Sequence, residues 1–157
     1  MEHALDITLS VNGTQVSRRV PARMHLIDFL RESLELTGSH IGCEHGVCGA
    51  CTVRVNGDIV RGCLMLAVQA NGCRVETIEG LSDSKELAGL QKAFHERNAL
   101  QCGFCTPGML MAAQDLILQN RKISREEIRA HISGNYCRCT GYQAIVDAIE
   151  EVINGQG

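Results

Sequence analysis

The first residues of the chain alternate between polar and apolar, with apolar side chains at Leu5, Ile7, Leu9 and Val11. This period of two residues is typical of a β-strand with one buried face. The pair Asn12-Gly13 follows and predicts a tight hairpin turn, after which residues 16–20 return as a second strand. Apolar residues then recur at helical spacing, which predicts a helix over residues 24–36.

Three further short strands are predicted in the middle of the chain, over residues 52–55, 59–61 and 74–78. The first two flank a second turn signal, Asn56-Gly57. A hairpin, a helix and several short strands together predict a small α+β domain that ends near Gly80.

The pattern becomes helical in the remainder of the chain. Four helices are predicted: one over 84–98, one that runs to 119 with Thr106 as its N-cap and Pro107 as its first residue, one after the capping box at 124–127, and one over 142–153. Four helices of this length predict a bundle. The stretch 79–83 marks the change of pattern, so we expect one domain over residues 1–80 and a second over residues 81–157.

Charge and hydropathy exclude several classes of partner. The formal net charge is −3 and no basic block is present, so the sequence predicts no nucleic-acid partner. The longest apolar runs are too short to span a bilayer. The N-terminus lacks the pattern of a signal peptide, and no apolar stretch follows Arg18-Arg19 as in a twin-arginine signal. A cytoplasmic protein with no membrane span is therefore expected.

Nine cysteines are the unusual feature of the composition. In a chain without an export signal they favour metal binding or catalysis over disulfides, and the odd count agrees with this. Eight of them fall into two sets of four, one set in each predicted domain.

The first set has the spacing C-x4-C-x2-C-x11-C and consists of Cys43, Cys48, Cys51 and Cys63. This is the spacing of a plant-type [2Fe–2S] loop. Four thiolates must surround two bridged irons, so the loop has to curl with its N–H groups directed at sulfur, and glycines permit that path. Zinc is the alternative, but zinc sites more often show two C-x2-C pairs without so much glycine.

The second set combines a C-x2-C and a C-x-C pattern and consists of Cys102, Cys105, Cys137 and Cys139. A quartet of this kind indicates a metal site, but its spacing does not separate iron from zinc. The C-x2-C part also resembles a redox dithiol, although such a dithiol belongs in a βαβ setting and would leave the other two cysteines unexplained. A cluster, a zinc site and a redox dithiol all stay open on spacing alone.

The other chemically notable residues have modest roles on this interpretation. Cys73 has no partner and is expected to be a small buried hydrophobe. His40 and His45 flank the first set and are expected to be solvated or hydrogen-bonded. No phosphate-binding glycine loop and no catalytic constellation is recognisable, so the sequence predicts an electron conduit with no catalytic residue on this chain.

Three stretches carry sequence detail beyond the cysteine spacing: Gly42 through Thr52, Gln101 through Met109, and Gly134 through Tyr142. Together they closely resemble the small iron–sulfur subunit of the molybdenum hydroxylases, the xanthine oxidase and aerobic carbon monoxide dehydrogenase group. The resemblance spans nearly the whole chain. Tyr136 departs from it, because the family usually has an aliphatic residue there, and this difference affects packing rather than any ligand.

The resemblance implies a β-grasp, ferredoxin-like [2Fe–2S] domain followed by a four-helix bundle that holds a second [2Fe–2S] cluster. It implies a large subunit that carries molybdopterin cytosine dinucleotide and a medium subunit that carries FAD, or a cytochrome in its place, in a heterotrimer or a dimer of heterotrimers. The first cluster would lie nearer the flavin and the second nearer the molybdenum. Gln101 and Cys139 would contact the pterin. The chain would then be the electron-transfer subunit of this oxidoreductase.

Overall fold

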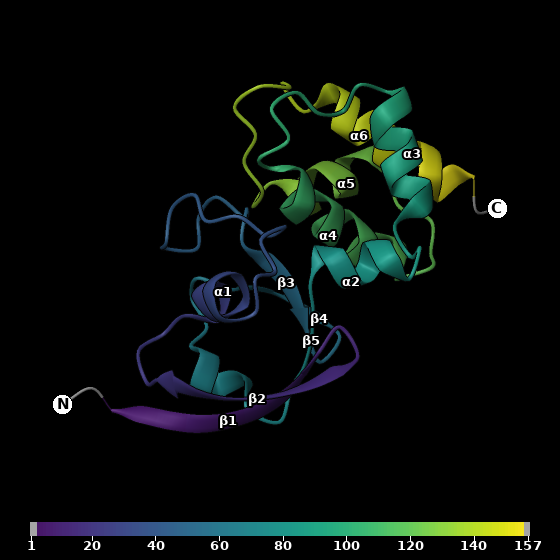
Figure 1. Ribbon diagram of the computed structural model, residues 1–157. Helices are drawn as coiled ribbons and strands as arrows, with labels where there is room; N and C mark the ends of the chain where they lie inside the picture. Colours follow the sequence, from purple (N-terminus) through teal and green to yellow (C-terminus); the bar gives the residue numbers. More distant parts are fainter. Residues whose placement is uncertain (1–2, 156–157) are drawn as a thin grey trace.

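The computed structural model describes residues 3–155, and its N-terminal half forms one mixed sheet of five strands. Figure 1 shows the strands on one side of the molecule and the helices of the C-terminal half on the other. The strands are β1 (Ala4–Val11), β2 (Thr14–Pro21), β3 (Thr52–Val55), β4 (Asp58–Arg61) and β5 (Arg74–Glu76). Their spatial order is β2-β1-β5-β3-β4, in which β1 and β5 are parallel and the other neighbours antiparallel. The predicted α+β domain is confirmed.

Both predicted hairpin turns are present. Asn12 and Gly13 join β1 to β2 with φ angles of 49° and 81°, and Asn56 and Gly57 join β3 to β4 with 53° and 101°. Two successive residues in the left-handed region match the right-handed twist of the strands, which is why Asn-Gly is favoured there.

The helix predicted over residues 24–36 is much shorter and partly of another kind. Helix α1 covers only Leu26–Asp28 and continues as a π-helical turn, η1, over Phe29–Ser33. The backbone N–H of Leu36 then closes the segment on the carbonyl of Leu30 at 2.9 Å. All four large apolar side chains of 26–30 are fully buried. These side chains belong to two different clusters: Leu26, Phe29 and Leu30 pack into the sheet core, and Ile27 packs against Cys51 and Cys63.

Five helices follow the sheet and pack into the second domain: α2 (Ile78–Asp83), α3 (Ala88–Glu96), α4 (Thr106–Ile117), α5 (Arg125–Ile132) and α6 (Gln143–Asn154). The last four correspond to the predicted bundle. Their shared core includes Phe94 of α3, Met109 of α4, Ile128 of α5 and Ile145 of α6. No helix among residues 3–155 is long and apolar enough to cross a membrane.

Helix α2 is a correction, because residues 79–83 were expected to be a connecting stretch and Ile78 the end of a strand. Asn12 explains the change. Its side chain exchanges two hydrogen bonds of 2.9 Å with Thr77, one with the backbone N–H and one with the hydroxyl. Thr77 is thereby held in an extended conformation at the N-cap of α2. Gly80 is needed beside it, since an added Cβ would lie 2.3 Å from the Asn12 amide oxygen.

The helix starts in the bundle were predicted with mixed success. The capping box of α5 is confirmed, with the Ser124 hydroxyl accepting from the N–H of Glu127. The expected N-cap of α4 is wrong: Cys105 occupies that position, and Thr106 lies in the first turn with its hydroxyl unbonded. Tyr142 is the N-cap of α6 and has a left-handed φ of 68°.

A buried arginine joins the two halves of the molecule. The Arg54 side chain on β3 is 8% exposed and binds Glu76 on β5 at 3.0 Å and Glu86, which precedes α3, at 2.8 Å. Gln114 of α4 donates to the same Glu86 carboxylate at 3.2 Å. The positive charge therefore has two carboxylate partners, one in each half, which offsets its burial.

Close backbone contact also joins the halves at the start of α4. A Cβ on Gly108 would lie 2.2 Å from the carbonyl oxygen of Gly49, a backbone atom that cannot swing aside. We expect Gly108→Ala to destabilise the protein by roughly 1–3 kcal/mol, because the two domains must separate to admit it. Denaturant unfolding measures this change.

The matched control is Gly89→Ala in α3, where the added Cβ would meet only a Val152 methyl group at 3.9 Å. This variant should be neutral or more stable, since alanine is the better helix former by about 1 kcal/mol. Equal changes in the free energy of unfolding for Gly108→Ala and Gly89→Ala would contradict the close contact at Gly108.

Candidate metal centres

The eight cysteines of the two predicted sets lie on loops rather than within strands or helices. Cys43, Cys48 and Cys51 belong to the loop before β3, and Cys63 follows β4. The second set lies on the loops that precede α4 and α6. All nine cysteines of the chain are free thiols.

Backbone amides converge on the sulfur of Cys43. The N–H of Cys48 points at this sulfur at 3.4 Å, and the N–H groups of His45 and Val47 add to it. These donors, that of Cys48 above all, lower the pKa of Cys43 to about 6. Gly46 and Gly49 have φ angles of 82° and 76°, which the curled loop requires. The predicted wrapping of N–H groups around sulfur is confirmed here.

The thiols of Cys43 and Cys48 interact and form one pair, and Cys51 and Cys63 form a second, deeper pair. Both are buried, and their thiols interact directly beneath Ile27 and Ile41. Burial raises the pKa of Cys51 to about 12. A buried thiol becomes a thiolate when a cation compensates its charge, so metal binding here is coupled to proton release.

The second set contains two more pairs. The sulfurs of Cys102 and Cys139 are 3.6 Å apart and exposed, whereas the thiols of Cys105 and Cys137 interact in a half-buried position. The Thr140 hydroxyl donates to the Cys137 sulfur at 3.0 Å. These contacts bring together cysteines more than thirty residues apart in the sequence.

The four thiols of this second set differ in acidity. Burial raises the pKa of Cys105 to about 12, and the hydrogen bond with Cys102 raises that of Cys139. The pKa of Cys137 is lowered: burial acts against this, but the Thr140 hydroxyl and nearby backbone N–H groups outweigh it. Donors directed at sulfur are what a thiolate ligand requires.

The thiols thus come as four pairs, two in each domain, which fits clusters whose two irons take two thiolates each. Among residues 3–155, no three His, Cys, Asp or Glu side chains converge as they would around a single ion. Two buried hydroxyls beside these loops, Ser39 Oγ and Thr106 Oγ1, have no protein partner. A bound cluster would offer sulfur atoms as acceptors for these two unpaired hydroxyl groups.

The loops of the two sets are joined directly. The backbone N–H of Tyr136, next to Cys137, donates to the Cys48 carbonyl at 2.8 Å. The His40 ring stacks on Phe104 with centroids 4.6 Å apart and donates to the Phe104 carbonyl at 2.8 Å. The expectation that His40 is hydrogen-bonded is confirmed, and His45 likewise donates to the Cys43 carbonyl.

Gln101, Cys139 and Cys73 lie at or near the surface. The Gln101 side chain donates to the Cys139 carbonyl at 2.9 Å, so the two residues expected at the pterin lie together on the surface. Cys73 was expected to be buried but is half-buried at the start of β5, packed against the sheet core. Its sulfur lies near the backbone carbonyls of Gln69 and Asn71, in the turn that leads into β5.

Sequence reasoning missed the residues that hydrogen-bond around the two cysteine sets. The Tyr142 hydroxyl accepts from the N–H of Cys137 at 2.7 Å, and Asn135 and Arg61 bridge the two domains. The only signal in the sequence was that these residues lie close to a cysteine. That signal does not say which of the residues near a cysteine direct their side chains toward it.

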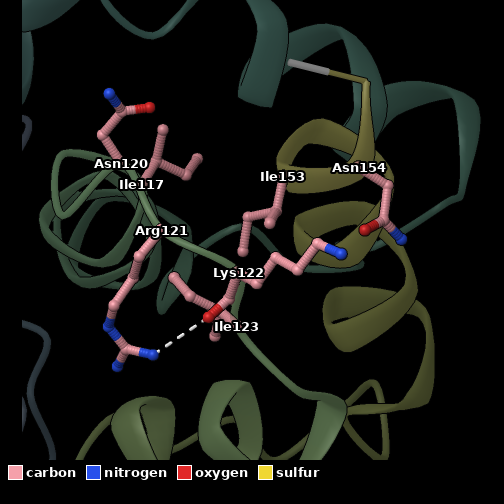
Figure 2. A pocket seen from close by; sticks show the side chains of 7 residues that line it. All are labelled: Ile117, Asn120, Arg121, Lys122, Ile123, Ile153 and Asn154. Carbon is pink, nitrogen blue, oxygen red and sulfur yellow. Dashed lines mark hydrogen bonds between the residues drawn. The ribbon is translucent and has the colours of Figure 1, made fainter. Parts of the chain in front are cut away.

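A hollow of about 390 Å³ lies elsewhere, at the C-terminal ends of α4 and α6 (Figure 2). Ile117, Ile123 and Ile153 line it, and the Arg121 guanidinium turns back to the Lys122 carbonyl at 3.1 Å. No cysteine lines this hollow, so it is separate from the candidate metal centres.

Known families match both halves of the chain. Residues 9–72 match the family described as 2Fe-2S iron-sulfur cluster binding domain, and residues 77–150 match the [2Fe-2S] binding domain. The caffeine dehydrogenase subunit gamma of Pseudomonas sp. (strain CBB1) is 54% identical over 93% of this chain and 89% of its own length. The chain belongs to the small iron–sulfur subunits of the molybdenum hydroxylases.

Other relatives of this small iron–sulfur subunit agree. The nicotine 6-hydroxylase small subunit of Paenarthrobacter nicotinovorans is 50% identical over 92% of the chain and 87% of its own length. The crystal structure of quinoline 2-oxidoreductase from Pseudomonas putida 86 contains a chain with a TM-score of 0.91 and 50% identity, covering 97% of this chain and 95% of that one.

Three expectations are thereby confirmed. The small iron–sulfur subunit has a ferredoxin-like β-grasp domain followed by a helical [2Fe–2S] domain, and it carries two [2Fe–2S] clusters. It transfers electrons within a molybdenum-containing oxidoreductase. The second cysteine set, whose spacing left zinc and a redox dithiol open, lies in a [2Fe–2S] binding domain.

Proposed function

We propose that this subunit relays electrons from a molybdopterin cytosine dinucleotide on a large subunit to FAD on a medium subunit, or to a cytochrome in its place. Each bound cluster supplies a site that takes up and releases one electron. Cys43, Cys48, Cys51 and Cys63 would hold the first cluster in the domain of residues 1–80. Cys102, Cys105, Cys137 and Cys139 would hold the second in the domain of residues 81–157.

The hydrogen bond from the Tyr136 N–H to the Cys48 carbonyl is the observation that carries this proposal. Tyr136 directly precedes Cys137 of the second cysteine set, and Cys48 belongs to the first set. One hydrogen bond of 2.8 Å therefore connects the backbone of the predicted ligand Cys48 to the residue directly before the predicted ligand Cys137 in the other domain. A relay needs its two carriers held at a fixed short separation, and this contact provides it.

Exposed apolar side chains support partners on the faces next to the cysteines. Seven large apolar side chains are exposed among the described residues: Leu5, Val47, Leu64, Leu100, Phe104, Leu118 and Tyr136. Five of the seven lie within two residues of a predicted ligand, the exceptions being Leu5 and Leu118. Exposed apolar side chains gathered at one place mark protein interaction sites.

The two partners would approach from different sides. Gln101 and the exposed Cys139 lie together, and we assign this face to the pterin of the large subunit. We assign Val47 and the loop around it to the medium subunit. The assembly would be a cytoplasmic heterotrimer or a dimer of such heterotrimers. The names of the relatives, which refer to caffeine, nicotine and quinoline, support an aromatic N-heterocycle as substrate of the large subunit.

Chemical analysis of the natively purified assembly tests the proposal. We expect about four irons and about four acid-labile sulfides for each copy of this chain, together with molybdenum and flavin on the co-purifying subunits. A complex without molybdenum would contradict the assignment of the large subunit. Zinc in place of iron and sulfide would contradict the two-cluster relay.

A further inference from the structure

A buried hydrogen-bond network fills the space between the two cysteine loops. Arg61, at the end of β4, donates to the carbonyl of Gly134 at 2.7 Å, to the Asn135 amide oxygen at 3.3 Å and to the Thr52 hydroxyl. The Asn135 amide nitrogen donates to the Gly49 carbonyl at 3.1 Å. Thr52 and Asn135 are fully buried.

Every member of this network is close in sequence to a predicted iron ligand. Arg61 is two residues from Cys63, Thr52 follows Cys51, and Asn135 is two residues before Cys137. The network therefore connects three ligand-bearing segments that come from both domains.

The approach is close because glycines provide the space. A Cβ on Gly134 would lie 2.8 Å from the Arg61 guanidinium. A Cβ on Gly49 would lie 2.6 Å from both the Asn135 amide nitrogen and the Gly134 carbonyl oxygen. Side chains at either position would separate the loops and displace the guanidinium.

The charge of Arg61 is unusual for a half-buried group. All its hydrogen bonds go to neutral acceptors, and none of the ion pairs among residues 3–155 includes it. Arg54, on the neighbouring strand, is by contrast bound by two carboxylates. A partly desolvated cation without a carboxylate is unfavourable unless another negative group lies nearby.

We infer that Arg61 is the cation that raises the reduction potentials of both clusters and holds the two cysteine loops against each other. This role rests on the proposed function, because the negative groups in question are the thiolate-ligated clusters. A one-electron reduction adds negative charge to a cluster, and a nearby fixed positive charge favours that reduced state. Its position between the loops explains why both clusters should respond.

Redox titration of the native assembly, followed by low-temperature EPR, tests the inference with two variants. Arg61→Gln removes the charge and retains hydrogen-bonding capacity, and Arg61→Lys retains the charge but loses the planar fork. We expect Arg61→Gln to lower the equilibrium constant for reduction of each cluster about tenfold, which is about 59 mV for a one-electron couple. Arg61→Lys should stay within about threefold of the unsubstituted protein.

Arg121→Gln is the control, because Arg121 lies beside the hollow at the far end of the bundle and pairs with exposed Glu127. It should leave both potentials unchanged. Loss of iron from Arg61→Gln but not from Arg61→Lys would also support the inference, because it would show that the clusters need a positive charge at position 61. Unchanged potentials in iron-loaded Arg61→Gln, equal shifts in both variants, or loss of iron from both would overturn the inference.

The EPR signals distinguish a failure of the proposed function from a failure of the role of Arg61. An unsubstituted protein without two cluster signals would refute the proposed function before any variant is compared. Two normal signals that do not respond to Arg61→Gln would refute only the role of Arg61.

Discussion

Replacing Cys105 by serine is expected to remove the second cluster and break the relay. Cys105 is half-buried and its thiol interacts with that of Cys137, so a serine there offers a hydroxyl that is a far poorer iron ligand. We expect the iron content to fall from about four to about two per chain. Electron transfer from the molybdenum subunit to the final acceptor should fall by roughly a hundredfold or more. Iron analysis and dye-linked turnover of the purified assembly measure the two effects.

Cys73→Ser is the matched control, since Cys73 is the one cysteine outside both sets. It is half-buried against the sheet core, so its replacement should leave iron content and turnover near those of the unsubstituted protein. Full iron content and full turnover in Cys105→Ser would contradict the ligand assignment. So would an equal loss in the two variants.

Arg54→Met is expected to give the largest loss of stability. The substitution leaves Glu86 without its cation and leaves Glu76 with only the exposed Arg74, at 3.7 Å. Removing one partner of a buried ion pair typically destabilises a protein by about 3–5 kcal/mol. Arg97→Met serves as the control, because Arg97 and its partner Glu151 are both exposed and contribute much less. Denaturant unfolding of both variants at neutral pH gives the comparison, and equal losses would contradict the account.

The same ion pair predicts a dependence on pH. The hydrogen bond with Arg54 lowers the pKa of Glu86 below its ordinary value of 4.5, although burial acts in the opposite direction. A carboxyl whose pKa is lower in the folded state contributes stability above its unfolded pKa, and the contribution is lost as pH falls. The difference in stability between the unsubstituted protein and Arg54→Met should therefore shrink as the pH falls below 4.5. A difference that stays constant through this range would show that Glu86 is not the partner that matters.

Local signals explain which parts of the fold were predictable. The turns Asn12-Gly13 and Asn56-Gly57 need positive φ at both residues, and few other pairs tolerate this, so their sequence nearly determines their structure. The capping box at Ser124 and Glu127 is likewise a contact between residues three apart. The cysteine spacing belongs to the same class, because one curled loop supplies three of the four thiols.

Long-range contacts explain what could not be predicted. Helix α2 exists where a connecting stretch was expected because Asn12, 65 residues away, fixes its N-cap Thr77. Arg54 stands in the strand sequence Thr-Val-Arg-Val, which looks half-exposed by alternation, yet all four residues are buried. Its partner Glu86 is 32 residues away. No periodicity in the sequence indicates either pairing.

The candidate site divides in the same way. Eight cysteines were identified as two sets from spacing, and the structure brings each set together as two thiol pairs. The bridge between the sets was not visible, since Arg61 and Asn135 are 74 residues apart. Resemblance to a family supplied the roles of the partners, but the contacts that hold one cluster loop against the other come only from the three-dimensional structure.

Low-temperature EPR of the dithionite-reduced, natively purified protein tests the central claim most directly. The account predicts two distinct S = 1/2 signals, each integrating to about one spin per chain, because each set of four cysteines holds one [2Fe–2S] cluster. It further predicts that Cys105→Ser abolishes one signal and leaves the other. A colourless, EPR-silent protein containing zinc, or a single signal from the unsubstituted chain with full iron, would contradict the two-cluster relay.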